Sequence, residues 1–561
     1  MTPKRLLLAR DFSLTLLSSF LLVLSFPDFN LGLMAWAGLL PLLLALNRKS
    51  LTHSFLLSLL CGMLFFMGIF HWILVVARYT LLHHALLALY LGSYFGFFGL
   101  AFSYVSSRSG TTPALLSAPF LWVSLEYVRS NLSFLALPWG LLGHSQHQYP
   151  IIIQIASLGG TYSISFLIVM VNAALMAVVY SFYEVLQLRQ KYHVKIPPGL
   201  PLPKGGVTTL QKNGPTIPPF LKGDVGRFQI SKKERMSLVI VAASLLFSAL
   251  LYGYFTITNT ITGNKFKISL VQGNIPQERK WDPRYAHEIM QIYTKLTERA
   301  SKDQPDMIVW PETATPGSIT IRPRLHMELI ETVRRIGAYL LVGSAPGQKF
   351  EAQSPMKLRY TNSAFLIPPG PGTVRSQRYD KIRLFPFGEY LPYKETLPWS
   401  WINVRESSYY AAGKDFTVFD LSDARFSVVI CWEDIFPDLV RQFVKRGAQF
   451  LVNLTNEAHF GKTAAPHQLV AMSVFRAVEN RVFVVRCANT GVSCIIDPYG
   501  RIVDRVKDEK GQDIFVRGTV TGWIIPMESN TIYTRYGDVL VWVAVLGTVG
   551  FLGVSILKRK N

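Results

Sequence analysis

Three residues, Glu312, Lys381 and Cys431, combine the side-chain types that acyl transfer through a thioester requires. Cys431 follows the apolar, β-branched run 428–430 and precedes an aromatic residue and two acids. This pattern predicts a buried strand that ends at a thiol on a sharp turn, which presents a nucleophile well. Glu312 ends a similar run at 307–311, and Lys381 lies at the start of a loop. The acid can accept the thiol proton, and the lysine, with the backbone N–H of Trp432, can hold the oxyanion.

These residues lie in a region where short apolar strands alternate with amphipathic helices. We expect helices at 284–302, 324–336, 436–446 and 466–480, and strands at 266–272, 306–310, 339–344, 360–367, 373–379, 416–420, 425–430, 449–453, 482–487, 492–497 and 514–520. Alternating strands and helices predict an α/β layered fold. Because strands outnumber helices, we expect two sheets in contact with helices outside, an α-β-β-α sandwich.

The rest of the chain has the composition of a membrane protein. Half of its 561 residues are hydrophobic and only 16% are charged. A spanning helix needs about 20 mostly apolar residues. Eight segments qualify as candidates: 12–27, 31–46, 54–77, 82–106, 113–130, 161–184, 236–257 and 537–557. The N-terminal apolar run is followed by a second one and lacks a cleavage site, so we interpret it as an uncleaved span.

The distribution of basic residues predicts the orientation. The net charge is +22, and Lys and Arg gather beside the apolar segments, including the linker 189–235 and the C-terminal tail. This pattern indicates membrane topology rather than nucleic-acid binding. With eight spans, every basic cluster lies on the cytoplasmic side if the N-terminus does. We therefore expect a transmembrane domain at 1–257, an extracytoplasmic catalytic domain at 258–536, and a last helix with a basic tail at 537–561.

A few polar residues outside the triad have two interpretations. Glu126 and Arg129, three residues apart, could form an interfacial ion pair or contact a lipid head group. Cys487 and Cys494 could form a disulfide across a hairpin or stay free. His144 and His147 lack further ligands at suitable spacing, so we predict no metal site.

The sequence resembles the nitrilase, or carbon–nitrogen hydrolase, superfamily at Glu312, Lys381 and Cys431, which match its Glu-Lys-Cys triad. Further motifs are similar to those of the apolipoprotein N-acyltransferase family, and the resemblance covers nearly the whole chain. These motifs are residues 271–277 with Lys280-Trp281, 386–392, 453–456, 486–491, 126–129, 138–139 and 143–146. Trp432 departs from the family pattern, because a tyrosine is common at that position. The linker 189–235 also looks long.

The resemblance implies a two-step reaction without a cofactor. Cys431 takes an acyl chain from a phospholipid, and the α-amine of a diacylglyceryl-cysteine on an apolipoprotein then attacks the thioester. It also implies supporting roles for three residues near the triad: Glu389, Asn362 and Glu433. Trp281 is expected to line the acyl pocket, and Trp432 to affect how the chain packs.

The same resemblance implies a multi-pass protein of the bacterial inner membrane with both termini cytoplasmic. Its partners would be the phospholipid donor, the apolipoprotein acceptor and the bilayer, and we expect a monomer without nucleic acid. The aromatic loop 385–402 either dips into the bilayer interface or covers the core of the catalytic domain.

Two other functions are compatible with the residues alone. A membrane-tethered amidase or hydrolase with the same triad would pass the acyl group to water. A non-enzymatic transporter or lipid-binding receptor would carry an inert nitrilase-like domain. Few charged residues lie within the apolar segments, whereas a transporter would be expected to carry them there.

Overall fold

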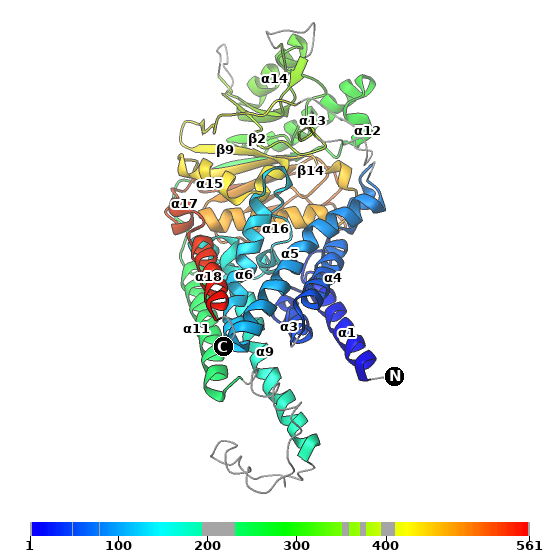
Figure 1. The fold of residues 1–561 in the computed structure, drawn as a ribbon. Coiled ribbons are helices and arrows are strands. Elements are labelled where there is room, and N and C mark those ends of the chain that lie inside the picture. Colours follow the sequence, from blue (N-terminus) through cyan, green and yellow to red (C-terminus); the bar gives the residue numbers. More distant parts are fainter. Residues whose placement is uncertain are drawn as a thin grey trace.

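The chain folds into a helical bundle at one end and a two-sheet sandwich at the other (Figure 1). The computed structural model describes residues 3–47, 49–77, 79–192, 230–349, 358–370, 377–393, 396 and 410–558. Most of the linker 189–235, and residues 394–395 and 397–402 of the loop 385–402, therefore lie outside the described residues. Both ends of the chain lie at the end of the bundle far from the sheets (Figure 1).

The bundle is built from residues before 258 and after 538. Its longer helices are α1 (Pro3–Leu24), α4 (Leu51–Ile69), α5 (Leu81–Ser109), α6 (Thr111–Asn131), α9 (Thr161–Tyr192), α11 (Lys232–Ile257) and α18 (Val539–Leu557). Short helices fill the gaps: η1 (Gly32–Met34), α2 (Ala35–Gly38), α3 (Leu40–Leu46), η2 (His71–Val75), η3 (Ser133–Leu135), η4 (Leu142–Gln146), α7 (Pro150–Ile153) and α8 (Ala156–Gly159).

Six of the described helices, α1, α4, α5, α9, α11 and α18, are long and apolar enough to cross a membrane. The predicted count of eight is therefore not confirmed. The expected span 31–46 is divided into three short helices. The expected span 113–130 is the 21-residue helix α6, which contains Pro119, Glu126 and Arg129 and is not among the six.

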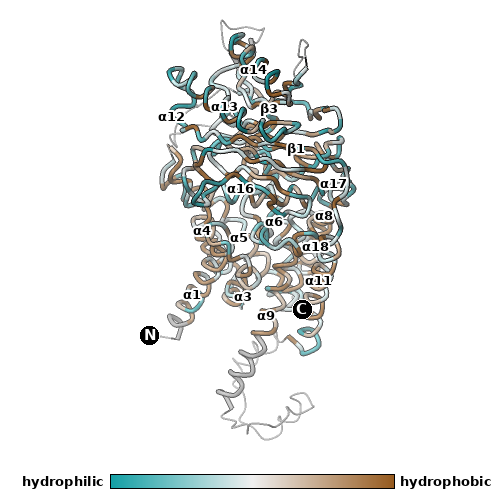
Figure 2. The backbone as a smooth tube through the Cα atoms, turned by 180° about the vertical axis from the view of Figure 1, so that it is seen from behind, coloured by the Kyte–Doolittle hydropathy of each residue, from teal (hydrophilic) through white to brown (hydrophobic). Residues whose placement is uncertain are grey.

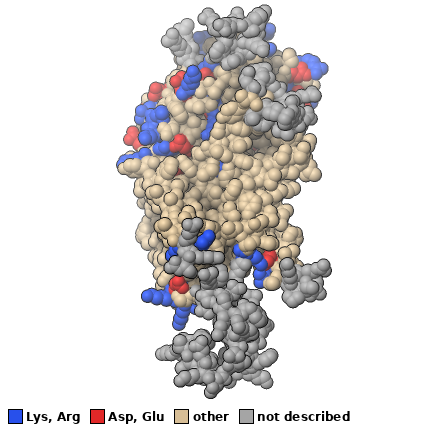
Figure 3. Space-filling view, viewed as in Figure 1, with Lys and Arg blue, Asp and Glu red and all other residues tan. Residues whose placement is uncertain are grey.

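The outer surface of the bundle is apolar. Helices α11 and α18 leave large side chains uncovered, such as Phe247 (66% exposed) and Leu546 (72%). The bundle is mainly hydrophobic along its length, whereas hydrophilic residues gather on the sandwich (Figure 2). On the face in Figure 3, charged side chains lie at both ends of the molecule and leave an uncharged belt between them. Such a belt fits the hydrocarbon core of a bilayer, where exposed charges are costly.

The sandwich consists of two six-stranded sheets, with orders β14-β1-β2-β3-β6-β7 and β13-β12-β11-β10-β9-β8. The first contains β1 (Phe266–Gln272), β2 (Met307–Val309), β3 (Tyr339–Ser344), β6 (Ser363–Ile367), β7 (Gln377–Asp380) and β14 (Gly518–Ile524). The second contains β8 (Phe419–Asp420), β9 (Arg425–Ile430), β10 (Phe450–Thr455), β11 (Phe483–Ala488), β12 (Cys494–Ile496) and β13 (Ile502–Arg505). A small hairpin joins β4 (Gly347–Lys349) to β5 (Leu358–Tyr360).

Each sheet has three parallel central strands, β1-β2-β3 and β9-β10-β11, and antiparallel strands at its edges. Helices α13 (Ala286–Ser301) and α14 (Pro323–Ile336) cover the first sheet, and α15 (Pro437–Lys445) and α16 (Ala465–Asn480) cover the second. The predicted α-β-β-α sandwich is thus confirmed. Short helices complete it: α12 (Gln277–Lys280), η6 (Pro283–Tyr285), η8 (Cys431–Ile435), η9 (Ala458–Phe460) and α17 (Ile532–Tyr536).

Helix α16 lies between the second sheet and the bundle, and almost all of its side chains are buried. Gln468 on this helix connects the two parts of the molecule. Its Oε1 accepts hydrogen bonds from the indoles of Trp72 (3.1 Å) and Trp139 (2.8 Å), and its Nε2 donates to the carbonyls of Pro27 (3.0 Å) and Ile69 (2.9 Å). One side chain of the sandwich thereby holds three segments of the bundle.

The two cysteines of the expected hairpin are separate, buried, free thiols. Cys494 pairs with Arg486 across β11 and β12. The Sγ of Cys487 points instead to the first sheet, toward the carbonyl of Val309 (3.2 Å). The disulfide interpretation is therefore wrong in this structure, because the strand register does not bring the two sulfurs together.

Candidate active site

Cys431 lies at the carboxyl end of β9, where the chain turns directly into η8. Its φ of 57° lies in the left-handed region, which is strained for a residue with a side chain. Neighbouring groups hold this conformation. Asn453 Nδ2 donates to the Cys431 carbonyl (3.0 Å), and Ile430 N donates to Glu433 Oε2 (2.7 Å). The sharp turn predicted from the run 428–434 is present.

Glu312 and Lys381 meet in a buried polar cluster. Glu312 follows β2 and Lys381 follows β7, and their side chains are 9% and 2% exposed. Lys381 Nζ lies 3.7 Å from Glu312 Oε1 and 2.9 Å from Glu389 Oε1. Asn362 Nδ2 donates to both carboxylates, at 2.7 Å to Glu312 and 2.9 Å to Glu389. The amide of Asn362 and the ammonium of Lys381 therefore hold the carboxylates of Glu312 and Glu389 together at the end of the sheets.

The backbone fixes these acids as well. Asn456 N donates to the second oxygen of Glu312 (2.9 Å), and Phe385 N donates to the second oxygen of Glu389 (2.7 Å). The loop of Glu312 packs directly on Gly343 of β3. A Cβ at that glycine would lie 2.8 Å from the Cα of Glu312, so only glycine permits this approach.

Glu433 connects the cysteine turn with the lysine loop. Its carboxylate is fully buried and accepts hydrogen bonds from Ile382 N (2.7 Å), Arg383 N (2.9 Å), Ile430 N (2.7 Å) and Tyr379 Oη (2.9 Å). Two of these donors follow Lys381 in the chain, and one directly precedes Cys431. Glu433 thus holds the two segments that carry the nucleophile and the cation.

The charges in the cluster explain its proton distribution. Burial opposes ionisation of Glu312, but the charges of Lys381 and Lys280 outweigh it and lower the pKa of Glu312. Burial also opposes the charge of Lys381, but Glu389 and Glu312 raise the pKa of Lys381 well above its usual range. Burial and the charge of Glu312 raise the pKa of the Cys431 thiol. The resting site is therefore a protonated thiol beside an ionised carboxylate and an ammonium, as general-base activation requires.

Lys280 belongs to this site, although the residues alone gave it no role. It is only 4% exposed, and its Nζ donates to the Glu312 carbonyl (2.8 Å). Burial lowers the pKa of Lys280 to about 8, against the raising effects of Glu312 and Cys431. In the sequence, the one indication of a role for Lys280 was its position beside Trp281 in a family motif. Its burial becomes visible only in the tertiary fold. The Trp281 ring is 49% exposed.

A pocket of about 370 Å³ opens at Trp432, the residue after Cys431, and Cys431 itself is not among the described residues that line it. The loop after Lys381 and the ring of Trp432 form one wall, and residues 133, 134 and 136 of the bundle form another. Trp432 is fixed there because its Nε1 donates to the Arg383 carbonyl (2.7 Å) and its ring packs edge-on against Phe385. Among the described residues that line this pocket, Trp281 is absent.

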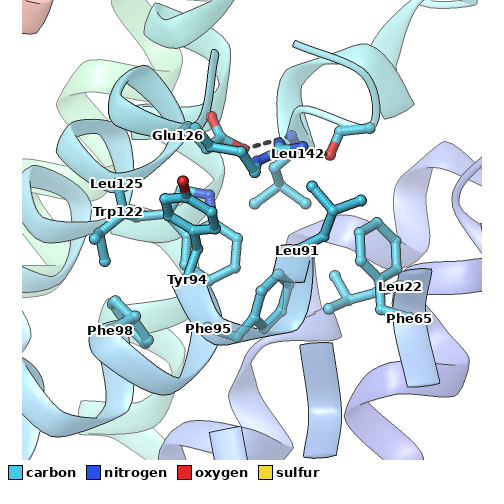
Figure 4. A pocket seen from close by; sticks show the side chains of 12 residues that line it. Leu22, Phe65, Leu91, Tyr94, Phe95, Phe98, Trp122, Leu125, Glu126 and Leu142 are labelled. Carbon is cyan, nitrogen blue, oxygen red and sulfur yellow. Dashed lines mark hydrogen bonds between the residues drawn. The ribbon is translucent and has the colours of Figure 1, made fainter. Parts of the chain in front are cut away.

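A second cavity lies inside the bundle between α5, α6 and the segment 140–142 (Figure 4). It measures about 20 Å³. One water molecule needs roughly 10–15 Å³, so this cavity is too small for an acyl chain. Glu126 lines it and accepts a hydrogen bond from Leu142 N (2.8 Å) (Figure 4).

Arg129, also at this cavity, donates to the carbonyls of Trp139 (2.7 Å) and Leu137 (3.2 Å). Arg129 and Glu126 are both buried, 3% and 6% exposed. Both side chains hold the segment that follows α6.

Known proteins match both halves of the chain. Residues 18–174 match the family model described as apolipoprotein N-acyltransferase N-terminal domain, and residues 267–517 match that of carbon-nitrogen hydrolase. The apolipoprotein N-acyltransferase of Geobacter metallireducens is 33% identical over 98% of this chain and 96% of its own length. That of Chlorobaculum tepidum is 30% identical over 99% and 98%.

Solved structures match about half of the chain. A mutant of the Nesterenkonia AN1 amidase from the nitrilase superfamily is 17% identical and covers 49% of this chain and 95% of its own, with a TM-score of 0.36.

Proposed function

Because the chain belongs to the apolipoprotein N-acyltransferase family and is an N-acyltransferase of lipoprotein maturation, we propose that it works through a thioester on Cys431. The acyl donor is a phospholipid, and the acceptor is the α-amine of the diacylglyceryl-cysteine that begins an apolipoprotein. The observation that carries this proposal is the buried cluster of Glu312, Lys381, Glu389 and Asn362 beside a strained cysteine.

In the first half-reaction, Glu312 accepts the thiol proton while the sulfur attacks the ester carbonyl of the phospholipid. The ammonium of Lys381 and the N–H of Trp432 stabilise the oxyanion. When the C–O bond breaks, the lysophospholipid alkoxide takes the proton from Glu312 and leaves.

In the second half-reaction, the acceptor amine attacks the thioester carbonyl and passes a proton to Glu312. The C–S bond then breaks, and the sulfur recovers that proton. Glu389 supports both steps by holding Lys381, whose charge it stabilises at 2.9 Å. The donor and the acceptor occupy the site in turn, because the lysophospholipid leaves before the amine binds, which is a ping-pong scheme.

We further propose the arrangement in the membrane. Residues 1–257 and 537–561 form the transmembrane part, and residues 258–536 form the catalytic domain on the extracytoplasmic side of the inner membrane. Both termini are then cytoplasmic. The uncharged belt of the bundle (Figure 3) and the position of the termini opposite the sheets (Figure 1) support this arrangement.

The test is intact-mass analysis of the whole protein in detergent after exposure to phospholipid. We expect a mass increase of one acyl group, its loss when a diacylglyceryl-cysteine peptide is added, and the matching N-acylated peptide. Cys431→Ser should form no thioester, and Cys61→Ala, which removes a buried thiol in α4, should react like the parent. Free fatty acid released at the same rate without acceptor would instead identify a hydrolase. Equal behaviour of Cys431→Ser and the parent would refute the thioester.

A further inference from the structure

The wall of the pocket at Trp432 carries a cationic side chain, Arg383, that the acyl-transfer steps do not use. Arg383 lines it together with Tyr390, Tyr410 and Trp432. Its volume of about 370 Å³ lies within the roughly 300–1,000 Å³ of small-molecule sites. The pocket is otherwise mostly aromatic and aliphatic, so a positive charge in its wall calls for an anionic partner.

The position of Arg383 is fixed on three sides. Its backbone N–H donates to Glu433 Oε1 (2.9 Å), and its carbonyl accepts from Trp432 Nε1 (2.7 Å). The guanidinium carbon lies 3.6 Å from the centre of the Phe436 ring. Stacking on an aromatic face leaves the edge N–H groups of an arginine available for hydrogen bonds in the plane.

Within the described part of the chain, no carboxylate lies at ion-pair distance from the guanidinium. Glu433, which accepts a hydrogen bond from the backbone N–H of Arg383, also accepts from Tyr379 and from the backbone N–H groups of Ile382 and Ile430. Its oxygens are therefore engaged elsewhere. A partly buried arginine stacked on a ring and lacking an acid partner is suited to bidentate recognition of a phosphate.

We propose that Arg383 binds the phosphodiester of the donor phospholipid while the acyl ester of the same lipid lies at Cys431. This inference rests on the proposed function. Arg383 follows the catalytic lysine by two residues, and Trp432, which follows the nucleophile, contacts its carbonyl. In a glycerophospholipid, only the glycerol unit separates the ester from the phosphate, so a lipid with its phosphate in this pocket has its ester near the turn that carries Cys431 and Trp432. The acceptor, a diacylglyceryl-cysteine, carries no phosphate.

Arg383 therefore acts in one half-reaction only. It holds the phosphate before the sulfur attacks, and it releases the same phosphate with the lysophospholipid after the C–O bond breaks. Once the thioester has formed, the site contains no phosphodiester, and aminolysis proceeds without help from Arg383. This separation distinguishes a donor-binding residue from one that merely supports the fold.

The test measures single-turnover acylation of the whole protein in detergent by intact mass, with two donors that share their acyl chains: phosphatidylethanolamine and a phosphate-free diacylglycerol. For Arg383→Gln we expect acylation by the phospholipid to slow roughly 30-fold, because the substitution removes the charge-assisted hydrogen bonds between the guanidinium and the phosphate. We expect an unchanged rate with diacylglycerol. Aminolysis of the preformed thioester should also be unchanged. Arg324→Gln, on the exposed surface of α14, is the matched control.

Equal slowing with both donors, or no slowing with either, would overturn the assignment of Arg383. If Arg383→Gln does not fold, the parent alone still decides, because the assignment requires that it prefer the phospholipid to diacylglycerol by about tenfold or more, and equal rates contradict it. A parent that forms no adduct with either donor would refute the proposed function itself, which is a different result.

Discussion

Glu433→Gln is the substitution that most directly tests how the fold holds the nucleophile. The glutamine has the same shape, but its NH₂ group replaces one oxygen. In the native structure both oxygens accept: Oε1 from Ile382 N and Arg383 N, and Oε2 from Ile430 N. Whichever way the amide is turned, at least one backbone N–H loses its acceptor and faces another donor. An unsatisfied buried N–H costs about 1–3 kcal/mol.

These hydrogen bonds fix the turn that carries Cys431, so the substitution disturbs the position of the nucleophile. If about 2 kcal/mol of the cost appears in the transition state, acylation of Cys431 slows roughly 30-fold, since 1.4 kcal/mol corresponds to a factor of ten. The assay is single-turnover acylation by phospholipid followed by intact mass. Tyr379→Phe removes one O–H donor and leaves the backbone bonds, so its effect should be smaller. Glu331→Gln, an exposed acid on α14, should behave like the parent.

A pH series gives a second, independent measure of the same carboxylate. Burial raises the pKa of Glu433 to about 7, against the lowering effects of the N–H groups of Arg383 and Ile430. The unfolded chain releases this proton near the usual value of about 4.3. Between these pH values the folded state binds more protons, so the contribution of Glu433 to stability falls as pH rises through this window.

The free energy of unfolding of the parent, relative to Glu433→Gln, should therefore drop by about 3 kcal/mol between pH 5 and pH 8. Thermal unfolding in detergent at several pH values measures it. A constant difference across that range, together with parent-like acylation by Glu433→Gln, would refute the reasoning.

Two further substitutions test other parts of the structure. Gln468→Leu leaves four buried hydrogen-bonding partners unsatisfied, so we expect the free energy of unfolding, measured by thermal unfolding, to fall by about 3 kcal/mol or more. Gln291→Leu, on the exposed face of α13, should change the free energy of unfolding little. Lys280→Met removes a buried ammonium whose pKa is lowered to about 8. In the unfolded chain this lysine has a pKa of about 10.4, so the unfolded state binds more protons between the two values and the folded state gains stability as pH rises. Between pH 8 and 9.5 the free energy of unfolding of the parent should therefore rise by about 2 kcal/mol relative to Lys280→Met. A difference between the two proteins that does not change with pH would contradict this.

The sequence predicted the strands that carry the site better than the contacts between them. Strands β1, β3 and β9 begin and end at the predicted residues, because each is a short, mostly apolar and largely buried segment. The turn at Cys431 was also predictable, since the run stops abruptly at an acid-rich segment. These features are local, and local patterns determine them.

The roles of Lys280 and Gln468 could not be predicted in the same way. A lysine and a glutamine are usually exposed, and nothing near them in the chain indicates burial. Lys280 is buried because β2 brings the Glu312 carbonyl to it, 32 residues further along the chain. The bundle covers the side of α16 that would otherwise face solvent, so nearly all of that helix is buried. Span counting failed at α6, which contains Pro119, Glu126 and Arg129, and at 31–46, which is divided into three short helices.

The bundle contributes more than attachment to the bilayer. Arg129 of α6 holds the carbonyls of Leu137 and Trp139, and so fixes the segment that runs from η3 toward the sandwich. Phe134 of that segment lines the pocket at Trp432 and meets Tyr393, in the loop after Lys381, edge-on, with ring centres 5.4 Å apart.

A soluble sandwich would lack this wall, and its pocket would open to water on that side. We infer that a lipid substrate requires it for two reasons. A wall built on the bundle lets an acyl chain pass from the bilayer to the sulfur without crossing water, and it keeps water from the thioester until the amine arrives. In the proposed thioester mechanism, a soluble sandwich without this wall should favour hydrolysis, so we expect the contact between Phe134 of η3 and Tyr393 to favour transfer.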